Sequence, residues 1–375
     1  MKKIIVLGAG MVGSAMAADL SEKFDVTSAD INQNALDELK KKYKINTLLI
    51  DLSDSEKISH LVSSFDFVIS AVPGFMGYKT LEAVIKAGKN VVDISFMPED
   101  TMQLNELAIQ HQVSAIVDCG VAPGMPNLIA GYYYERMQIE HFEYMVGGLP
   151  KVRTFPFEYK APFSPIDVIE EYTREARYKE NGQLITKPPM SDAELIFFNQ
   201  IGHLEAFNTD GLRSLLYTLP AIQNMKEKTL RYPGHIKLIQ ALQQSGFFSN
   251  EPIEFEGKQI RPMDFNSKIL FKAWKLQPGE EEFTVMRVSL FGKMNGKSTE
   301  VVYNLFDVFD QSTQISSMAR TTGYTATAAA NMMLDGLFSE KGVFPPELVG
   351  KHEKCFNYMI DYLKERNVIY IKKEI

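Results

Sequence analysis

The chain has 375 residues, of which 40 are Lys or Arg and 47 are Asp or Glu, so its formal net charge at pH 7 is −7. An acidic balance without a long basic tract excludes the electrostatic attraction on which non-specific nucleic-acid binding depends. At roughly 150 residues per domain, this length predicts two to three domains whose cores need neither a disulfide nor a metal for stability.

Two features bear on the compartment. The two cysteines, Cys119 and Cys355, fit no metal-ligand spacing, and so low a cysteine count is typical of a reducing compartment. The apolar run Ile4–Leu7 is too short for a signal peptide, and no run reaches the roughly eighteen residues of a membrane span. We therefore expect a cytoplasmic protein that binds no metal, no membrane and no nucleic acid.

The N-terminal third alternates short β-branched runs with helical patterns, which is typical of parallel strands joined by crossover helices. The expected strands are Lys3–Leu7, Val26–Ala29, Asn46–Ile50, Phe67–Ser70, Asn90–Ile94 and Ser114–Val117. The expected helices are Ser14–Leu20, Asn34–Lys42, Lys79–Ala87 with Gly88 after it, and Asp100–Gln110. This rhythm predicts a doubly wound Rossmann sheet, in which ligands bind at the carboxyl ends of the strands.

The pattern changes after Pro123, where a second domain is expected to begin. Asn127 is expected to cap a helix that runs to about Met137, and a strand Ile139–Val146 follows it. The run Gly147–Pro150 then predicts a break in the chain, because glycine and proline weaken a strand.

A β-hairpin is the clearest element of this second domain. Phe283–Gly292 and Ser298–Asp307 are joined around Asn295-Gly296, the pair favoured where both turn residues need positive φ. Lys179–Met190 shows no strand pattern and is expected to form a surface loop. The segment predicts an inserted α+β domain with a mixed, mostly antiparallel sheet.

The C-terminal segment is again helical in pattern. An Ala-rich stretch covers about Met318–Leu337, and Ala328–Ala330 allow it to pack closely on the first sheet. A charged amphipathic stretch covers Lys351–Arg366. The expected division is a Rossmann domain of residues 1–124 completed by residues 316–375, and an inserted domain of residues 125–315 for substrate binding and dimerisation.

The motif Gly8-Ala9-Gly10-Met11-Val12-Gly13 follows the first expected strand and opens a helix. Gly8 permits a tight turn, Gly10 lets the backbone approach a pyrophosphate, and Gly13 lets the helix pack on the strand. Asp30 ends the second strand about 20 residues on, where a carboxylate binds ribose hydroxyls and repels a 2′-phosphate. Since Ile31-Asn32-Gln33 supply no cation, the motif predicts NAD rather than NADP, with a glycine turn that binds no ligand as the alternative.

Two further strand ends are expected to complete the cofactor site. Asp51 follows the third strand, where it can lie near the adenine or cap the next helix. Ala71, Val72 and Pro73 follow the fourth strand and offer a rigid apolar wall for a nicotinamide, although a simple turn would have the same pattern.

Three polar residues follow the fifth and sixth strands. Asp93, Ser95 and Asp118 are expected to share one edge of the sheet. A carboxylate that is partly desolvated under a cofactor has a raised pKa and can act as a general base or bind a cationic substrate. The alternative is that either aspartate caps a helix or holds a loop.

The second domain contributes basic residues in turn-rich, aromatic surroundings. Arg213 and Arg231 are candidates for binding an α-carboxylate, because the guanidinium fork matches that group. Each has the alternative of a solvated or structural ion pair. His235 is expected to be structural.

Several longer motifs stand in order along the chain. They are Gly8–Gly13, Val91–Phe96, Gly120–Gly124, Gly147–Pro150, Ser164-Pro165 with Glu170–Tyr172, Asp210–Arg213 and Thr229–His235. In these motifs the chain resembles the saccharopine dehydrogenase family, and within it the short, two-domain lysine 6-dehydrogenase-like branch. The resemblance implies a Rossmann domain completed by C-terminal helices, and an inserted domain that carries substrate contacts and dimer surface.

The resemblance also bears on single positions. Ser95 and Arg213 fall where relatives that make or split saccharopine contact the substrate. Where those relatives have an aspartate before the Pro-Gly turn this chain has Ala122, and where they have a cysteine before Gly-Gly-Leu-Pro it has Val146. Both departures favour a smaller amino substrate, such as lysine, over saccharopine.

These observations predict an NAD-dependent oxidoreductase that acts on the CH–NH₂ group of an amino acid, with the ε-carbon of L-lysine as the leading substrate. Asp93 and Asp118 are the candidate bases, and Ser95, Arg213 and then Arg231 are the candidate substrate contacts. The alternatives are a saccharopine dehydrogenase and a non-catalytic NAD-binding regulator. We expect a homodimer or a larger homo-oligomer.

Overall fold

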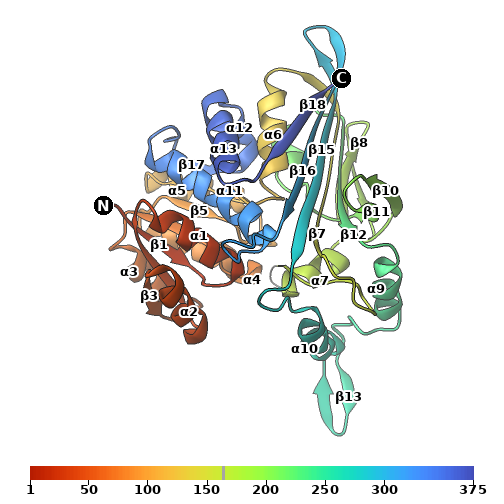
Figure 1. The fold of residues 1–375 in the computed structure, drawn as a ribbon, viewed down its shortest axis with the longest axis horizontal. Helices are drawn as coiled ribbons and strands as arrows, with labels where there is room; N and C mark the ends of the chain where they lie inside the picture. The colour runs from red at the N-terminus through yellow and green to blue at the C-terminus, as the bar shows by residue number, and fades with distance from the viewer. Residues whose placement is uncertain (163–164) are drawn as a thin grey trace.

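The computed structural model describes residues 1–162 and 165–375, and two sheets lie side by side in it (Figure 1). The first is parallel throughout, in the order β17-β6-β5-β4-β1-β2-β3. Its strands are β1 (Lys3–Leu7), β2 (Asp25–Asp30), β3 (Asn46–Leu49), β4 (Phe67–Ser70), β5 (Val91–Asp93), β6 (Ser114–Ile116) and β17 (Gly342–Phe344). The order reverses between β1 and β4, which places a crevice at the carboxyl ends of these strands.

Both faces of this sheet are buried. Along β1, Ile4 and Val6 belong to one apolar cluster while Ile5 and Leu7 belong to another on the opposite face. A continuous apolar strand of this kind requires helices on both faces. The covering helices from the N-terminal part are α1 (Met11–Ser21), α2 (Gln33–Tyr43), α3 (Ser55–Val62), α4 (Gly74–Lys86), the 3₁₀ helix η1 (Thr101–Leu104) and α5 (Asn105–Gln110).

The prediction of a doubly wound parallel sheet is confirmed, and each expected strand is present. Among the helices of the N-terminal part, the sequence analysis missed α3. Its N-cap is Asp54, whose carboxylate accepts hydrogen bonds from the backbone N–H groups of Glu56 and Lys57. That Asx-type cap is the signal that would have revealed α3.

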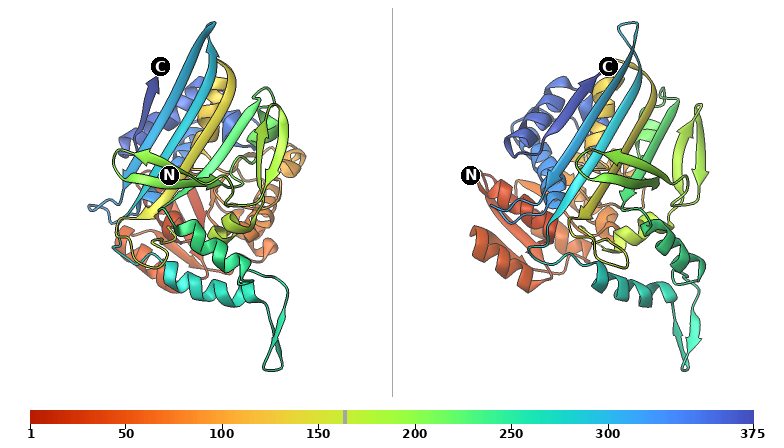
Figure 2. Two further views of the ribbon diagram at one scale, coloured as in Figure 1. Left: turned by 90° about the vertical axis from the view of Figure 1, so that its right-hand side faces the viewer. Right: turned by 45° about the vertical axis from the view of Figure 1, so that its right-hand side comes forward.

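The second sheet is mixed and mostly antiparallel, as predicted. Its main path is β10-β11-β12-β7-β15-β16-β18, with β8 paired to β12 and β9 paired to β8. The strands are β7 (Gln138–Pro150), β8 (Ala176–Glu180), β9 (Gln183–Lys187), β10 (Glu194–Phe198), β11 (Gly202–Asn208), β12 (Asn224–Arg231), β15 (Glu282–Met294), β16 (Lys297–Val308) and β18 (Tyr370–Glu374). In the left view of Figure 2, this sheet faces the viewer and lies in front of the parallel sheet and its helices.

The expected hairpin is confirmed, because β15 and β16 pair along almost their full length and Asn295 and Gly296 both have positive φ. The predicted break at Gly147–Pro150 is wrong, since these residues continue β7. A Cβ at Gly147 would lie 2.6 Å from the carbonyl oxygen of Leu230, so this strand needs glycine for close approach to β12.

Three further predictions need correction. The expected loop Lys179–Met190 contains most of the β8–β9 hairpin instead. Asn127 is not the N-cap of its helix, which is α6 (Met125–Tyr134); it is the third helical residue, and its side chain accepts a hydrogen bond from Gly124 N. Residues 316–375 do not all return to the first sheet, because β18 pairs with β16 in the second.

The remaining helices surround the two sheets. They are α7 (Pro165–Thr173), α8 (Leu215–Thr218), α9 (His235–Gln244), α10 (Pro262–Trp274), α11 (Ser317–Leu334), α12 (Pro346–Gly350) and α13 (Glu353–Glu365). A small hairpin of β13 (Ile253–Phe255) and β14 (Lys258–Ile260) projects beyond α10 (Figure 1). Ser164 of the Ser-Pro motif lies outside the described residues.

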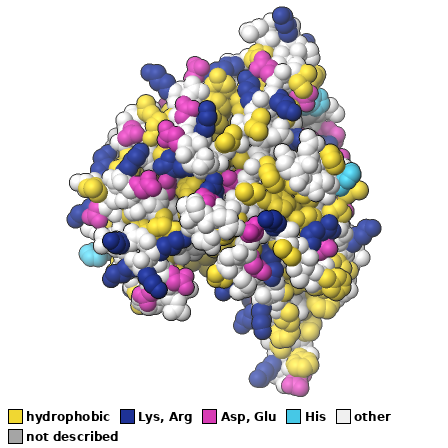
Figure 3. Space-filling model, viewed as in Figure 1, with side chains coloured by type: hydrophobic (Ala, Val, Ile, Leu, Met, Phe, Trp, Pro, Cys, Tyr) yellow, Lys and Arg dark blue, Asp and Glu magenta, His cyan; other side chains and the backbone are white. Residues whose placement is uncertain are grey.

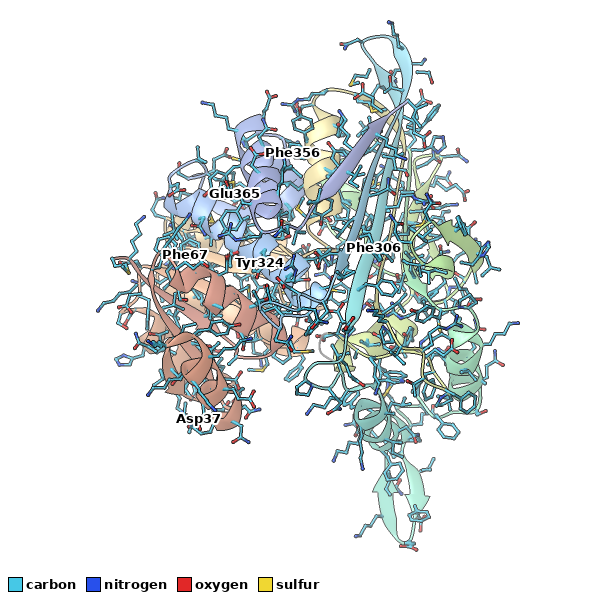
Figure 4. The ribbon with its side chains drawn as sticks, viewed as in Figure 1. Asp37, Phe67, Phe306, Tyr324, Phe356 and Glu365 are labelled. Carbon is cyan, nitrogen blue, oxygen red and sulfur yellow. The ribbon has the colours of Figure 1, made fainter. Side chains whose placement is uncertain are left out.

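Helix α11 is the element that joins the two halves, and it is buried along most of its length. It packs against α1 and contacts β15 and β16, and Tyr324 on it lies between the parallel sheet and the large sheet (Figure 4). Arg320 pairs with Asp307 and Asp310 near the end of β16. The expected Ala-rich cover is therefore present, and it faces both sheets.

Neither a membrane segment nor a metal cluster is found in the described part of the chain. No helix there combines the length and apolarity needed to cross a bilayer. No group of three or more His, Cys, Asp or Glu side chains within residues 1–162 and 165–375 is placed to hold a metal ion.

The crossing of α6 and α12 gives a testable prediction of stability. A Cβ at Gly131 would clash with the backbone of Glu347, so the two helices touch through their backbones. We expect Gly131→Ala to lower the free energy of unfolding by about 1–3 kcal/mol, because the helices must separate to admit a methyl group. Gly10→Ala is the matched control, because its Cβ would meet no atom within 4 Å. Equal denaturation midpoints for the two variants would contradict this packing.

Candidate active site

A cavity of about 820 Å³ lies where the carboxyl ends of the parallel strands face the second sheet. One side is formed by the glycine turn after β1 and by the ends of β2 and β4. The other side is formed by β7, β12 and α11, through residues such as Val146, Thr229 and Met318. Both halves of the chain therefore contribute to one site.

The glycine turn has the geometry that a dinucleotide requires. Gly8 has a φ of +109°, and a Cβ on it would lie 2.6 Å from the carbonyl oxygen of Ala71. A Cβ on Gly13 would clash with Gly8, whereas Gly10 has open space around it. Because no side chain caps the N-terminus of α1, its first N–H groups are available to a pyrophosphate at the Gly10 position.

Asp30 stands at the end of β2 and lines the cavity. Its carboxylate accepts hydrogen bonds from Ala9 N at 2.6 Å and from Asn32 N at 2.7 Å. The first bond ties the end of β2 to the glycine turn. Within the described lining of the cavity, no lysine lies near Asp30 and the single arginine is Arg231 on β12.

The other predicted cofactor contacts also line the cavity. Asp51 does so, and its carboxylate accepts a hydrogen bond from Ser53 N, which holds its pKa below the usual value. Since Asp54 caps α3, the helix-cap alternative for Asp51 is wrong. The remaining predicted cofactor residues on this wall are Met11, Val12, Ala71, Val72 and Pro73.

Asp93 lies behind Ser95, and Ser95 faces the cavity. Ser95 lines the cavity and donates its hydroxyl to Asp93 at 3.0 Å, and Ser95 N donates to the same carboxylate at 2.8 Å. Asp93 is fully buried beneath it, and burial raises the pKa of this carboxyl to about 7. Asp93 is not among the lining residues, so the geometry makes it a positioning residue for Ser95 rather than a base in contact with substrate.

Of the two predicted bases, Asp118 is the one that lines the cavity. It follows β6 with a φ of +52°, and only 4% of it is exposed. Its Oδ2 accepts a hydrogen bond from Arg213 Nε at 2.8 Å, while its buried Oδ1 has no hydrogen-bond partner among the described residues. An unsatisfied buried acceptor is costly unless a ligand supplies the donor.

Arg213 does not line the cavity. Besides Asp118, its guanidinium donates to the carbonyl oxygen of Met97 at 2.8 Å and lies over the ring of Phe96. The prediction that Arg213 holds a substrate carboxylate is therefore not supported by this geometry. The alternative, a structural ion pair, describes it, and through this pair Arg213 positions Asp118.

Arg231 does line the cavity, but it too is paired. Its Nη2 donates to Glu171 at 2.7 Å, and its Nε donates to the Tyr172 hydroxyl at 3.0 Å. The Tyr172 hydroxyl also shares a hydrogen bond of 2.9 Å with His235. Burial lowers the pKa of His235 to about 3, which agrees with its predicted structural role.

Sequence analysis missed a carboxyl group on the wall of the second sheet. Glu227 lies on β12, is 5% exposed and accepts hydrogen bonds from Thr209 Oγ1 at 2.7 Å and from Gly211 N at 3.0 Å. The period of two along a strand places Glu227, Thr229 and Arg231 on one face. This alternation along the strand is the sequence signal that could have revealed Glu227 as a residue of the site.

Comparisons with known proteins agree with this architecture. The saccharopine dehydrogenase NADP binding domain matches residues 4–116, and the saccharopine dehydrogenase C-terminal domain matches residues 120–369. The chain belongs to the saccharopine dehydrogenase family. Its N-terminal third is thus a nicotinamide dinucleotide-binding domain of that family.

Relatives in this family differ in length. Mitochondrial alpha-aminoadipic semialdehyde synthase of Bos taurus is 22% identical over 98% of this chain, but the chain spans about half, 47%, of that protein. Carboxyaminopropylagmatine dehydrogenase of Synechocystis is 23% identical, with 92% of each chain covered. The structure of apo saccharopine dehydrogenase (L-Glu forming) from Saccharomyces cerevisiae superposes with a TM-score of 0.82 at 19% identity, covering 100% of both chains. That likeness shows the fold.

The buried pair at the site gives a second prediction. Arg213→Ala should lower the free energy of unfolding by about 3–5 kcal/mol, because it leaves the buried Asp118 carboxylate without a partner. Adding Asp118→Asn to this variant should recover part of the loss. Lys151→Ala, which removes an exposed pair with Glu281, is the control and should cost less than about 1 kcal/mol. Chemical denaturation of the four proteins measures these differences, and a small loss in Arg213→Ala would contradict a structural pair.

Proposed function

We propose that this protein is an NAD-dependent dehydrogenase that oxidises the CH–NH₂ group of an amino acid, with the ε-carbon of L-lysine as the favoured position. The observation that carries the proposal is the unpaired Oδ1 of Asp118 in a cavity that also holds the dinucleotide-binding turn. The substrates would be lysine, NAD and water, and the products an aldehyde, ammonium, NADH and a proton.

The residues of the chain divide the work as follows. The nicotinamide, when bound, accepts a hydride from the carbon that carries the amine. Asp118 Oδ1 accepts a proton from the substrate ammonium, which frees the nitrogen lone pair for imine formation. Arg213 holds that carboxylate in place from the opposite oxygen. Water then hydrolyses the imine to the aldehyde, which cyclises onto the α-amine.

Ser95, Arg231 and the apolar wall orient the substrate. Ser95 Oγ stands at the cavity surface on a buried hydrogen bond to Asp93. Arg231 is the arginine among the described residues that line the cavity, and it replaces Arg213 as the candidate for a contact with the substrate carboxylate. Val72 and Pro73 supply a flat apolar surface on the nicotinamide side.

A second candidate is oxidation of a secondary amine of the saccharopine type. The names of the relatives favour it, because they include saccharopine dehydrogenases and carboxyaminopropylagmatine dehydrogenase. The same Asp118 carboxylate would serve this reaction. A regulator that only binds NAD would leave the unpaired Asp118 oxygen without a use.

Assembly and location stay proposals. We infer a homodimer, because apolar side chains are exposed on β15 and β16 of the large sheet and on the projecting hairpin with α10, where Figure 3 shows them at the tip of the molecule. The exposed apolar residues are Ile253, Phe255, Phe265, Ile269, Phe291 and Phe306. We also propose a cytoplasmic location, from the low cysteine count, and a role in substrate binding for residues 125–315.

The activity is tested by measuring NADH formation with NAD and L-lysine, and separately with saccharopine. We expect NADH from lysine without any keto acid. Asp118→Asn should lower kcat by about 10²–10⁴-fold while NADH binding is retained, because it removes the proton acceptor. NADH formation from saccharopine but not from lysine would favour the second candidate, and none from either would contradict both.

Cofactor choice gives a separate prediction. NAD should bind more tightly than NADP by about 2 kcal/mol, because Asp30 loses its ribose hydrogen bonds and meets a phosphate when NADP is present. Asp30→Asn keeps an acceptor for Ala9 N but removes the negative charge. The variant should therefore bind NADP more tightly, which reduces the difference in affinity between NAD and NADP. Fluorescence titration of both dinucleotides checks this, and equal affinities in the unaltered protein would overturn the NAD assignment.

A further inference from the structure

A small chamber opens off the main cavity on the side of the second sheet. It has a volume of about 40 Å³, enough for a few non-hydrogen atoms. The residues that line both spaces are Phe96, Ala122, Pro123, Val146, Glu171 and Thr229. A substrate whose reacting carbon lies beside Asp118 can therefore extend its far end into this chamber.

Glu227 forms part of the chamber wall. Both of its hydrogen bonds, from Thr209 Oγ1 and Gly211 N, are made to Oε2. Thr209 in turn shares a hydrogen bond of 2.8 Å with Thr229, which lines both spaces. In the described part of the chain, Glu227 Oε1 has no hydrogen bond, so this oxygen is available to a ligand.

One carboxyl group of the chamber lacks a cationic partner among the described residues. Arg174, the arginine among the described lining residues of the chamber, is paired with Glu170, and the lining residue Glu171 is paired with Arg231 of the main cavity. Asp210 is likewise paired with Arg177. Glu227 is then the lining carboxyl that has no cationic partner among the described residues. Burial and the neighbouring Glu171 raise the pKa of Glu227 to about 8, which is the behaviour of a carboxyl kept from solvent without a counter-charge.

We propose that this chamber is a subsite for a second cationic group of the substrate, an ammonium that binds Glu227 Oε1 while a different amine of the same molecule is oxidised beside Asp118. The inference rests on the proposed amine oxidation and narrows it. The substrate class becomes compounds with two amines, such as a diamino acid. A substrate that places only carboxylates in this chamber is disfavoured, because Glu227 there has no cationic partner among the described residues.

The polar surroundings of Glu227 suit this role. The Thr209 and Gly211 donors hold Oε2, so the carboxyl group is already fixed when an ammonium group enters. Binding therefore requires little reorganisation of the protein. The Tyr144 hydroxyl, also in the chamber, donates to the carbonyl oxygen of Gly211 and fixes the same loop. The site is therefore built before the ligand arrives.

Three ligands that differ by one group test the subsite directly. L-lysine has both amines and a carboxylate, cadaverine lacks the carboxylate, and 6-aminohexanoate lacks the second amine. We expect the NADH-bound protein to bind lysine and cadaverine about tenfold or more tightly than 6-aminohexanoate in calorimetric titrations, the scale of one charge-assisted hydrogen bond. Equal affinities for the three ligands would overturn the proposal, whatever any variant does.

Glu227→Gln locates the effect, because it keeps an acceptor for Thr209 and Gly211 but removes the charge. The substitution should lower the affinity for lysine and for cadaverine by about tenfold, and the affinity for 6-aminohexanoate by less than about threefold. Glu254→Gln, on the exposed hairpin strand β13, is the matched control and should change none of the three affinities. An equal loss for all three ligands in Glu227→Gln, or no loss, would overturn the assignment to Glu227.

These outcomes are separate from the test of activity. If lysine and cadaverine bind in this pattern but no amine yields NADH, the oxidation proposal fails while the cationic subsite stands. If lysine yields NADH but the preference for a second amine is missing, the subsite fails and the proposed activity stands.

Discussion

The ion pair between Asp118 and Arg213 is the interaction on which the site depends. The carboxylate comes from the end of the parallel sheet and the guanidinium from the inserted domain, so the pair joins the two walls of the cavity. Both residues have positive φ, at 52° and 48°, a conformation that non-glycine residues adopt only where the surrounding structure holds them. Arg213 also grips the carbonyl oxygen of Met97, which fixes the segment after β5. Arg213 thus holds the Asp118 carboxylate through Oδ2, while Oδ1 stays unpaired among the described residues.

Close backbone approach is the second constraint, and it explains where glycine is needed. The turn after β1 requires Gly8 and Gly13, because a Cβ at either position meets backbone atoms. Gly147 plays the same part on the opposite wall, where β7 and β12 lie against each other. Gly131 lets α6 touch α12, whose Glu347 is fully buried and accepts hydrogen bonds from Asn127 and Thr218. Glycines therefore permit close backbone packing in both walls of the cavity and at the crossing of α6 and α12.

Sequence patterns predicted the parts that depend on local periodicity. The strands of the parallel sheet, the glycine turn with Asp30, and the Asn295-Gly296 hairpin each carry a signal within a few neighbouring residues. The break expected at Gly147–Pro150 was wrong, because glycine has the same local signal whether it ends a strand or permits close packing. Arg213 was expected at a substrate carboxylate, yet it pairs with Asp118. A partner 95 positions away leaves no trace in the pattern around either residue.

The distribution of charge argues for an amine substrate more strongly than any single residue does. Each guanidinium near the cavity already has a carboxylate partner, namely Arg213 with Asp118, Arg231 with Glu171 and Arg174 with Glu170. Asp118 Oδ1 and Glu227 Oε1, by contrast, have no hydrogen-bond partner among the described residues. Ala122 and Val146, the two departures from the saccharopine pattern, line the chamber beside Glu227 and add no charge to it. Because these guanidinium groups are paired and the two carboxyl oxygens are not, the distribution of charge agrees with the proposed ammonium-binding roles of Asp118 and Glu227.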